Sequence, residues 1–313
     1  MQDEGRPGSR GSGVSSGGAL DCHALRIANL LVGNEASAAG LETTLGGLRL
    51  QFADTRAIAW CGGRFEVRIG DWPLAAGRPA IVRAGEVLNF GHPDVGCRAW
   101  LAISGGVDVP QVLGSRSTDL RGGFGGFEGR ALRHADVLPL GTNARRSEQW
   151  ISALDREGAS WLASASWASP AAREPELRVM RGGEWLRFDP DVRTGFLRVP
   201  YAVTPQADRM GVRLEGPPLQ YDGPELLSEA VSAGAVQVPP SGQPIILLPD
   251  CQTIGGYPKL AHVITVDLPI AAQLRAGDQV RFELVRLAEA HDLLQQRERE
   301  VALFRAALAM RIR

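Results

Sequence analysis

The chain has 313 residues, 44% of them hydrophobic and 22% charged, which is enough for about two globular domains. Its net charge of −1 argues against the basic surface with which proteins bind nucleic acid or anionic membranes. The 38 glycines and 20 prolines lie mostly between apolar runs, a composition typical of many short strands and tight turns. Because no signal peptide opens the chain and no apolar run has the length of a membrane span, we expect a cytoplasmic protein.

The first half of the chain changes from a polar opening to a helix and then to strands. Residues 1–18 are rich in Gly and Ser and by themselves resemble a disordered tail. A helix is predicted over about 20–32, because apolar residues recur there at helical spacing before a Gly-Asn stop signal. From 41 to 140, short β-branched or aromatic runs bounded by turn residues predict an antiparallel barrel or sandwich.

The domain organisation follows from composition. Residues 1–145 are predicted to form an N-terminal β-rich domain. Residues 146–176 mix Ser, Ala and charge and end in Pro, so they are predicted to be a connector. Strand patterns resume over 177–286, the predicted C-terminal barrel domain.

A final amphipathic helix is predicted over 287–313. Its apolar residues recur every seven positions, at Leu287, Leu294, Val301 and Leu308. This stripe must be covered, and docking on the chain's own domain is favoured over docking on another chain. The expected fold class is therefore mainly β, with a β-barrel, a few short helices and a C-terminal helix.

Some kinds of chemistry have no motif in this sequence. The four cysteines form no Cys-x-x-Cys pair and none lies at metal-ligand spacing from a histidine, so we expect buried reduced thiols and no metal site. There is no Lys-bearing phosphate loop and no H-E-x-x-H. The biotin-acceptor tripeptide Met-Lys-Met is also absent, so any biotin would be carried on another chain.

Four segments carry polar residues for which a plain β scaffold has little use: 2–21, 114–130, 207–216 and 236–259. In the last of them a short apolar strand is followed by Asp250, Gln252 and Thr253 and then by Gly255, Gly256 and Tyr257. Polar groups at a strand end, followed by glycines that allow close approach to the backbone, are typical of binding sites. A tight turn in which the Asp bonds its own backbone explains the pattern equally well.

Two other polar segments are equally open to a structural explanation. Asp208, Arg209 and Arg213 lie close together in sequence and form either a structural ion pair or a clamp for a carboxylate. Arg116 and Ser117 precede a glycine-rich stretch that is either a mobile lid or a long loop.

Long ungapped motifs, among them LAISGGVDVPQVLGSRSTDLRGGFGGFEGR, DRMGVRLEGP and VQVPPSGQPIILLPDCQTIGGYPK, closely resemble the KipA-like family, and the resemblance runs from residue 2 to about 286. This family includes the C subunit of 5-oxoprolinase and one half of the carboxyltransferase region of urea carboxylase, labelled allophanate hydrolase subunit 2. The resemblance implies a cyclophilin-like β-barrel, and partnership with a KipI-like B subunit and a separate A subunit. Family members usually have a further strand before the Gln-Asp pair, whereas Met1 stands directly before Gln2 here.

The resemblance implies a complex that hydrolyses 5-oxo-L-proline to L-glutamate with ATP and is active only when assembled. ATP is then expected mainly on a partner or at an interface. Two alternatives stay open. One is the carboxyltransferase half of a biotin-dependent urea-type carboxylase, with biotin on another chain. The other is a non-catalytic regulatory partner of a KipI-like protein.

For the hydrolase we assign catalytic roles to Arg209, Asp250 and Gln252. Arg209 would stabilise negative oxygens and Asp250 would orient a proton or a water molecule. The expected substrate-binding residues are Arg116, Ser117, Asp208, Arg213, Gln237, Thr253, Gly255, Gly256 and Tyr257.

Overall fold

The computed structural model describes residues 1–142 and 145–311, which divide into two compact units. The first unit comprises Met1–Gly5, Gly17–Ala171 and Arg299–Arg313. The second comprises Arg6–Ser16 and Ala172–Glu298. Segments from both ends of the chain therefore contribute to the two units.

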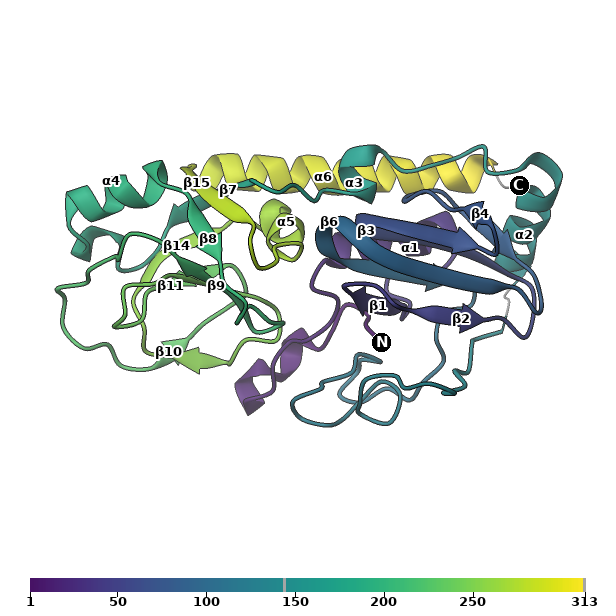
Figure 1. Ribbon diagram of the computed structural model, residues 1–313, viewed down its shortest axis with the longest axis horizontal. Helices are drawn as coiled ribbons and strands as arrows, with labels where there is room; N and C mark the ends of the chain where they lie inside the picture. The colour runs from purple at the N-terminus through teal and green to yellow at the C-terminus, as the bar shows by residue number, and fades with distance from the viewer. Residues whose placement is uncertain (143–144, 312–313) are drawn as a thin grey trace. The chain divides into compact units, whose positions relative to one another are not determined.

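An antiparallel sheet forms the body of the first unit (Figure 1). Its strands are β1 (Leu41–Thr44), β2 (Arg49–Gln51), β3 (Arg56–Ile69), β4 (Trp72–Pro73), β5 (Ala80–Val82) and β6 (Val87–Ile103). The strand order is β1-β6-β3-β4, with β2 also paired to β6 and β5 to β3. The long strands β3 and β6 lie side by side and carry most of the pairing (Figure 1).

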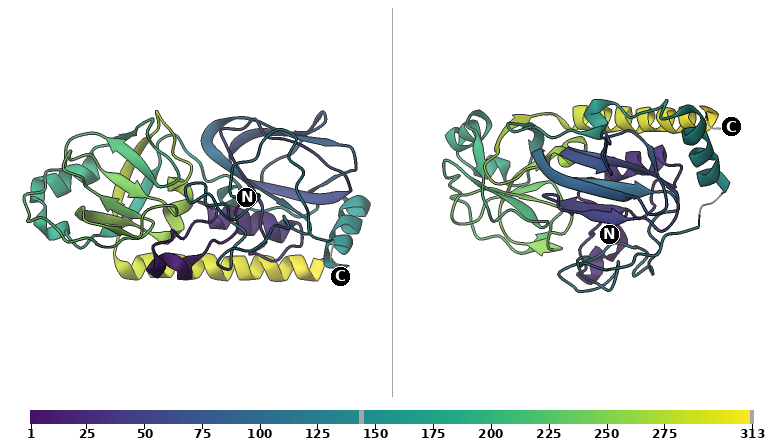
Figure 2. Two further views of the ribbon diagram at one scale, coloured as in Figure 1. Left: turned by 90° about the horizontal axis from the view of Figure 1, so that it is seen from below. Right: turned by 45° about the vertical axis from the view of Figure 1, so that its right-hand side comes forward.

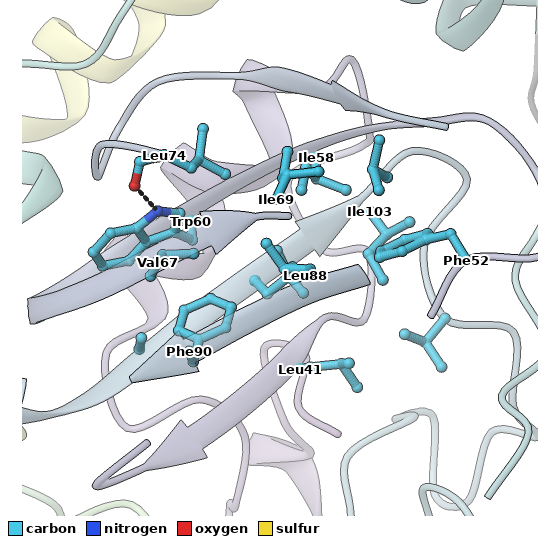
Figure 3. Packing of buried hydrophobic residues seen from close by; sticks show 14 of the residues in the cluster. Leu41, Phe52, Ile58, Trp60, Val67, Ile69, Leu74, Leu88, Phe90 and Ile103 are labelled. Carbon is cyan, nitrogen blue, oxygen red and sulfur yellow. Dashed lines mark hydrogen bonds between the residues drawn. The ribbon is translucent and has the colours of Figure 1, made fainter. Parts of the chain in front are cut away.

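The alternation along β3 explains how this sheet buries its core. Phe65, Val67 and Ile69 are buried and charged residues stand between them, as expected for a strand with one face on the core. The Trp60 ring packs edge-on against Phe65 and Phe90, and its Nε1 donates to the carbonyl oxygen of Leu74 at 3.0 Å (Figure 3). The large aromatic residue therefore buries its ring without leaving its one donor unpaired.

Helix α1 (Cys22–Leu31) packs on this sheet and lies inside the range predicted for the first helix. Asp21 caps it by accepting a hydrogen bond from the Ala24 nitrogen at 2.7 Å. At its other end the Leu31 carbonyl accepts from Trp150 Nε1 at 2.8 Å. Trp150 belongs to α2 (Arg145–Glu157), which begins one residue before the predicted connector, and α3 (Ala165–Ala168) lies within that connector.

In the second unit, seven of the described strands close into a barrel (Figure 1). They are β7 (Glu176–Arg181), β8 (Tyr201–Val203), β9 (Gly211–Glu215), β11 (Ala235–Gln237), β12 (Ile245–Leu247), β14 (Lys259–Val263) and β15 (Gln279–Leu284). Their order around the barrel is β11-β12-β9-β8-β15-β7-β14, and β15 and β7 run parallel. Strands β10 (Glu229–Ala230) and β13 (Ile254–Gly255) form a separate two-stranded ribbon.

The second unit also contains short helices. They are η1 (Pro7–Ser12), η2 (Trp185–Arg187), α4 (Pro190–Arg198), η3 (Thr265–Asp267) and α5 (Leu268–Ala271). Phe196 of α4 stacks on Phe282 of β15 with ring centroids 4.4 Å apart, and both rings are buried. Tyr201 completes this aromatic cluster, and burial raises its pKa to about 12.

Helix α6 (Leu287–Arg311) is uninterrupted; its first part belongs to the second unit and its last part to the first (Figure 2). Ala290 packs in a core cluster of the second unit. Val301 and Leu308 are buried, whereas Leu287 is 57% exposed. The predicted stripe is therefore covered by the chain itself along most of its length.

The mainly β fold class, with a barrel, short helices and a C-terminal helix, is confirmed. The polar opening is ordered rather than tail-like, because Pro7–Ser12 form η1 and Arg10 is hydrogen-bonded to residues of the barrel unit. The expectation of buried thiols is confirmed for Cys61, Cys97 and Cys251 and is wrong for Cys22, which is exposed. None of the described helices combines the length and the apolar character needed to span a membrane.

Candidate functional site

Side chains from four neighbouring strands form a row on the barrel. The strand register pairs Arg213 on β9 with Ile245 on β12, and Ile245 with Gln237 on β11. Gln237 is paired in turn with Lys259 on β14, next to a register shift between Val236 and Gln237. Directly paired residues project from the same face of a sheet, and register shifts of this kind re-aim side chains. Residues far apart in sequence are thereby brought onto one surface.

A pocket of about 790 Å³ is lined by part of this row, and we call it the barrel pocket. Five of the predicted site residues line it: Asp208, Arg213, Gln237, Gln252 and Tyr257. An adjoining pocket of about 920 Å³ shares Gln252 and Tyr257 and also includes Gly255 and Gly256. The fold therefore brings seven of the predicted site residues together in these two pockets.

The β10–β13 ribbon brings Gly255 against Gln237. A Cβ atom at Gly255 would lie 3.1 Å from Gln237 Nε2 and 3.4 Å from Gln252 Nε2. Gln237 is only 1% exposed, and its Nε2 has no hydrogen-bond partner among the described residues. A glycine at this position keeps open the space on which the two side-chain amides converge.

Arg209 and Asp250 bind each other, and neither is among the residues that line the barrel pocket or the adjoining one. Arg209 Nε donates to Asp250 Oδ2 at 2.7 Å and Arg209 Nη2 donates to Oδ1 at 3.2 Å. The two side chains are 16% and 19% exposed, so this is a two-pronged and largely desolvated ion pair. Asp208, by contrast, accepts from the backbone nitrogens of Met210 and Gly211 and shapes the turn before β9.

Thr253 follows this ion pair on the path to the ribbon. Its carbonyl oxygen accepts from the Val231 nitrogen at 3.1 Å. Its backbone therefore helps to hold the ribbon that carries Gly255.

Arg116 and Ser117 belong to the first unit, whereas the other ten predicted site residues belong to the second. Asp3 accepts from Ser115 Oγ at 2.6 Å, from the Arg116 nitrogen at 2.6 Å and from Ser117 Oγ at 2.5 Å. Ser117 is fully buried, and the Arg116 side chain lies 3.5 Å from the carboxylate of Asp108. These contacts hold the start of the 114–130 segment against the N-terminal residues.

Sequence reasoning missed Arg10. Its Nη2 donates to the carbonyl oxygens of Val231 and Gln252. Burial raises the pKa of the neighbouring Cys251 thiol, and the Arg10 charge acts in the opposite direction. The only signal in the sequence was the run of polar residues in which Arg10 stands.

Sequence reasoning also missed Lys259, which is the only lysine in the chain. Its Nζ forms ion pairs with Glu184, at 3.5 Å, and with Glu229 of the ribbon. A count of lysines against arginines would have singled it out.

The charges around the barrel pocket are mixed. Arg213 is accompanied by two carboxylates, Asp208 and Glu215. This lining does not fit a polyphosphate, whose charge calls for several cations or glycine-loop amides. In the part of the chain that the structure describes, no group of three or more His, Cys, Asp and Glu side chains could hold a metal ion.

Comparison with known proteins identifies relatives along nearly the whole chain. The family model described as "Carboxyltransferase domain, subdomain A and B" matches residues 12–284. The chain is 41% identical to the C subunit of 5-oxoprolinase from Escherichia coli K12, over 96% of this chain and 92% of that protein. It is 38% identical to the C subunit of 5-oxoprolinase from Haemophilus influenzae, over 95% and 92% respectively. The solved structure of Kluyveromyces lactis urea carboxylase is similar with a TM-score of 0.87 and 29% identity, covering 97% of this chain and 28% of that one.

Proposed function

This chain belongs to the carboxyltransferase domain family, subdomains A and B, and on that premise we propose that it is the C subunit of an ATP-dependent 5-oxoprolinase. The observation that carries the proposal is the near full-length similarity to two bacterial proteins of that name. The complex would hydrolyse 5-oxo-L-proline to L-glutamate in the cytoplasm, with a KipI-like B subunit and a separate A subunit as partners. The chain would be inactive alone.

The barrel pocket is the proposed substrate site. Its side chains offer amide donors from Gln237 and Gln252, a cation from Arg213 and a phenol from Tyr257. A lactam with a carboxylate substituent needs such groups, because its carbonyl accepts hydrogen bonds and its carboxylate pairs with a guanidinium. Gly255 and Gly256 would allow the substrate to approach the backbone.

Arg209 and Asp250 are proposed to act as a unit. Asp250 would orient the attacking water or accept its proton, and Arg209 would hold the carboxylate in position while stabilising negative charge that develops nearby. Gln252 would orient the substrate. Roles for Thr253, Arg116 and Ser117 in substrate binding stay predictions.

ATP would supply the driving force for opening the unstrained lactam. Transfer of its terminal phosphoryl group to the exocyclic carbonyl oxygen, with release of ADP, would activate the carbonyl carbon towards attack by water. The ring C–N bond then breaks as the nitrogen takes a proton, and a second water hydrolyses the resulting acyl phosphate to glutamate and phosphate. The mixed charge of the barrel pocket favours an ATP site mainly on a partner or at an interface with one. This chain would then bind and orient the organic substrate.

The similarity to urea carboxylase favours a second candidate, the carboxyltransferase half of a biotin-dependent urea-type carboxylase. Biotin would then be carried on another chain. A pocket that binds a planar carbonyl group beside a cation suits both reactions. The two candidates therefore differ in the substrate, which is 5-oxo-L-proline for the hydrolase and urea for the carboxyltransferase.

The test is reconstitution. The chain is co-expressed with A and B subunits of a bacterial 5-oxoprolinase, and ATP-dependent release of glutamate from 5-oxo-L-proline is measured with and without this chain. The expected result is release only when all three proteins and ATP are present. A complex without this chain and a complete mixture without ATP serve as controls.

An assembled complex that releases no glutamate contradicts the proposal. Transfer of carboxylate from carboxybiotin to urea by the same preparation would then support the second candidate. If Asp250→Asn left glutamate release at the full rate, the catalytic role of Asp250 would be wrong although the place of the chain in the complex would stand.

A further inference from the structure

The side-chain amide nitrogen of Gln237 is buried and unpaired among the described residues, so it does not stabilise the fold. A buried donor without a partner destabilises the folded state, and buried polar groups are nearly always satisfied. Gln237 is 1% exposed and occupies a barrel strand between two strands that pair with it. An apolar side chain of similar size would satisfy the packing there, so the amide points to a role other than packing.

A second amide converges on the same space. Gln237 Nε2 and Gln252 Nε2 both lie within 3.4 Å of the point where a Cβ of residue 255 would stand. Gln237 and Gln252 also both line the barrel pocket, so the two amides can donate to one acceptor oxygen of a ligand bound there. Gln252 is exposed, so its side chain can swing aside to admit a ligand to the buried amide.

A primary amide carries a donor and an acceptor side by side, in either orientation of its end group. The matching ligand edge is a cis amide, in which the N–H and the C=O point to the same side. A five-membered lactam ring holds its amide in this cis form, and urea presents the same edge. Open-chain peptide bonds are trans and do not present it.

We propose that Gln237 recognises the cis-amide edge of the substrate in the barrel pocket. Its Nε2 donates to the substrate carbonyl oxygen, its Oε1 accepts from the substrate N–H, and Gln252 Nε2 donates to the same carbonyl oxygen. This assignment deepens the proposed function and rests on it for the choice of a lactam over urea.

The row on the barrel assigns the remaining substrate group. Arg213 lies two strands away from Gln237, so their backbones are roughly 10 Å apart. The arginine side chain is long enough to reach across part of this distance, and the remaining gap is about the size of a small ring. Arg213 therefore pairs with the carboxylate of 5-oxoproline. Urea has no carboxylate, so its affinity should not depend on Arg213.

The test measures ligand affinity in the assembled complex without ATP, so that it does not depend on turnover. The ligands are 5-oxo-L-proline, 2-pyrrolidinone (the lactam without its carboxylate), urea and L-proline (the ring without its amide carbonyl). Isothermal titration gives each dissociation constant, and thermal unfolding of the full chain is recorded for each variant.

The decisive variants are Gln237→Leu and Gly255→Ala. Each is expected to weaken binding of both lactams at least about tenfold, the first by removing the amide and the second by filling the space in front of it. Gln237→Leu should melt no lower than the wild type, because an unsatisfied buried donor is removed. Gln279→Leu, at an exposed glutamine on barrel strand β15 that lines neither the barrel pocket nor the adjoining one, is the matched control and should leave every affinity unchanged.

Arg213→Gln should weaken 5-oxoproline alone, leaving 2-pyrrolidinone unchanged. Lactam affinity that survives Gln237→Leu, or equal binding of L-proline, overturns the proposal. Binding of urea but of neither lactam overturns the lactam assignment. Urea would then be the ligand whose N–H and C=O groups Gln237 recognises. A wild-type complex that binds lactams through Gln237 but releases no glutamate contradicts the proposed function and leaves this inference standing.

Discussion

Each unit buries a polar side chain within one of the polar segments singled out in the sequence. The two side chains differ in whether their hydrogen bonds are satisfied within the chain. In the first unit the carboxylate of Asp3 is 8% exposed and accepts from Ser115 Oγ, Ser117 Oγ and the backbone nitrogens of Arg116 and Gly5. In the second unit the amide nitrogen of Gln237 is just as buried and has no partner among the described residues.

This difference in hydrogen bonding distinguishes a side chain that stabilises the fold from one that binds a ligand. A buried carboxylate that accepts several hydrogen bonds holds distant segments together, because removing it leaves every donor unsatisfied. A buried amide without a partner lowers stability, and for Gln237 the partner that we propose is a ligand. Two buried polar side chains therefore have different consequences when they are changed, according to whether their hydrogen bonds are satisfied within the chain.

Asp3→Ala should have the largest effect. Two hydroxyls and two backbone nitrogens lose their acceptor, which should lower the free energy of unfolding by about 3 kcal/mol. Urea denaturation of the full chain measures this. Asp108→Ala removes an exposed carboxylate of the same unit as a control and should cost less than about 0.5 kcal/mol. A loss below about 1 kcal/mol for Asp3→Ala would show that the cluster is not a structural tie.

Arg209→Met should destabilise the chain by about 2 kcal/mol, because it leaves the carboxylate of Asp250 partly buried without its cation. The double variant Arg209→Met/Asp250→Leu should recover part of that loss, since both charges are gone. A double-mutant cycle from denaturation curves gives the coupling energy. Additive effects of the two changes would indicate that the pair is not coupled, contrary to its two-pronged geometry.

Lys259→Met should lower stability by roughly 1–2 kcal/mol, chiefly by depriving the poorly exposed Glu184 of its cation. Lys259→Arg is the charge-preserving control. The hydrogen bond from Lys259 lowers the pKa of Glu229 below its ordinary 4.5 in the folded state. That contribution is present above the ordinary value and is lost as the pH falls through the lowered one.

The stability gap between Lys259→Met and wild type should therefore be widest near neutral pH and should narrow below about pH 4. Thermal unfolding at a series of pH values measures it. A gap that stays constant over this range would show that the Glu229 contact adds nothing to stability.

Gln237→Leu should have the smallest effect on stability and the opposite sign. Removing an unsatisfied buried donor should raise the free energy of unfolding by up to about 1 kcal/mol, measured by urea denaturation of the ligand-free chain. A clear loss of stability would place Gln237 in the same class as Asp3 and would remove the distinction on which the comparison rests.

Local sequence determined the kind of structure. The alternation of β3, with Phe65, Val67 and Ile69 on one face, requires a strand with a buried side. Asp21 before an apolar helical stripe determines where α1 begins. The predicted strands and helices needed only the neighbours of each residue, because backbone periodicity and capping are local properties.

Tertiary structure alone decided which polar residues meet. The sequence placed Arg209 beside Asp208, but the fold pairs it with Asp250, and it converts a tail-like opening into η1 with Arg10 bound to the loop after β12. Gln237 and Arg213 share a surface only through the register of three strands. Register and long-range hydrogen bonds depend on how whole strands align around a closed barrel, and no short stretch of sequence carries that information.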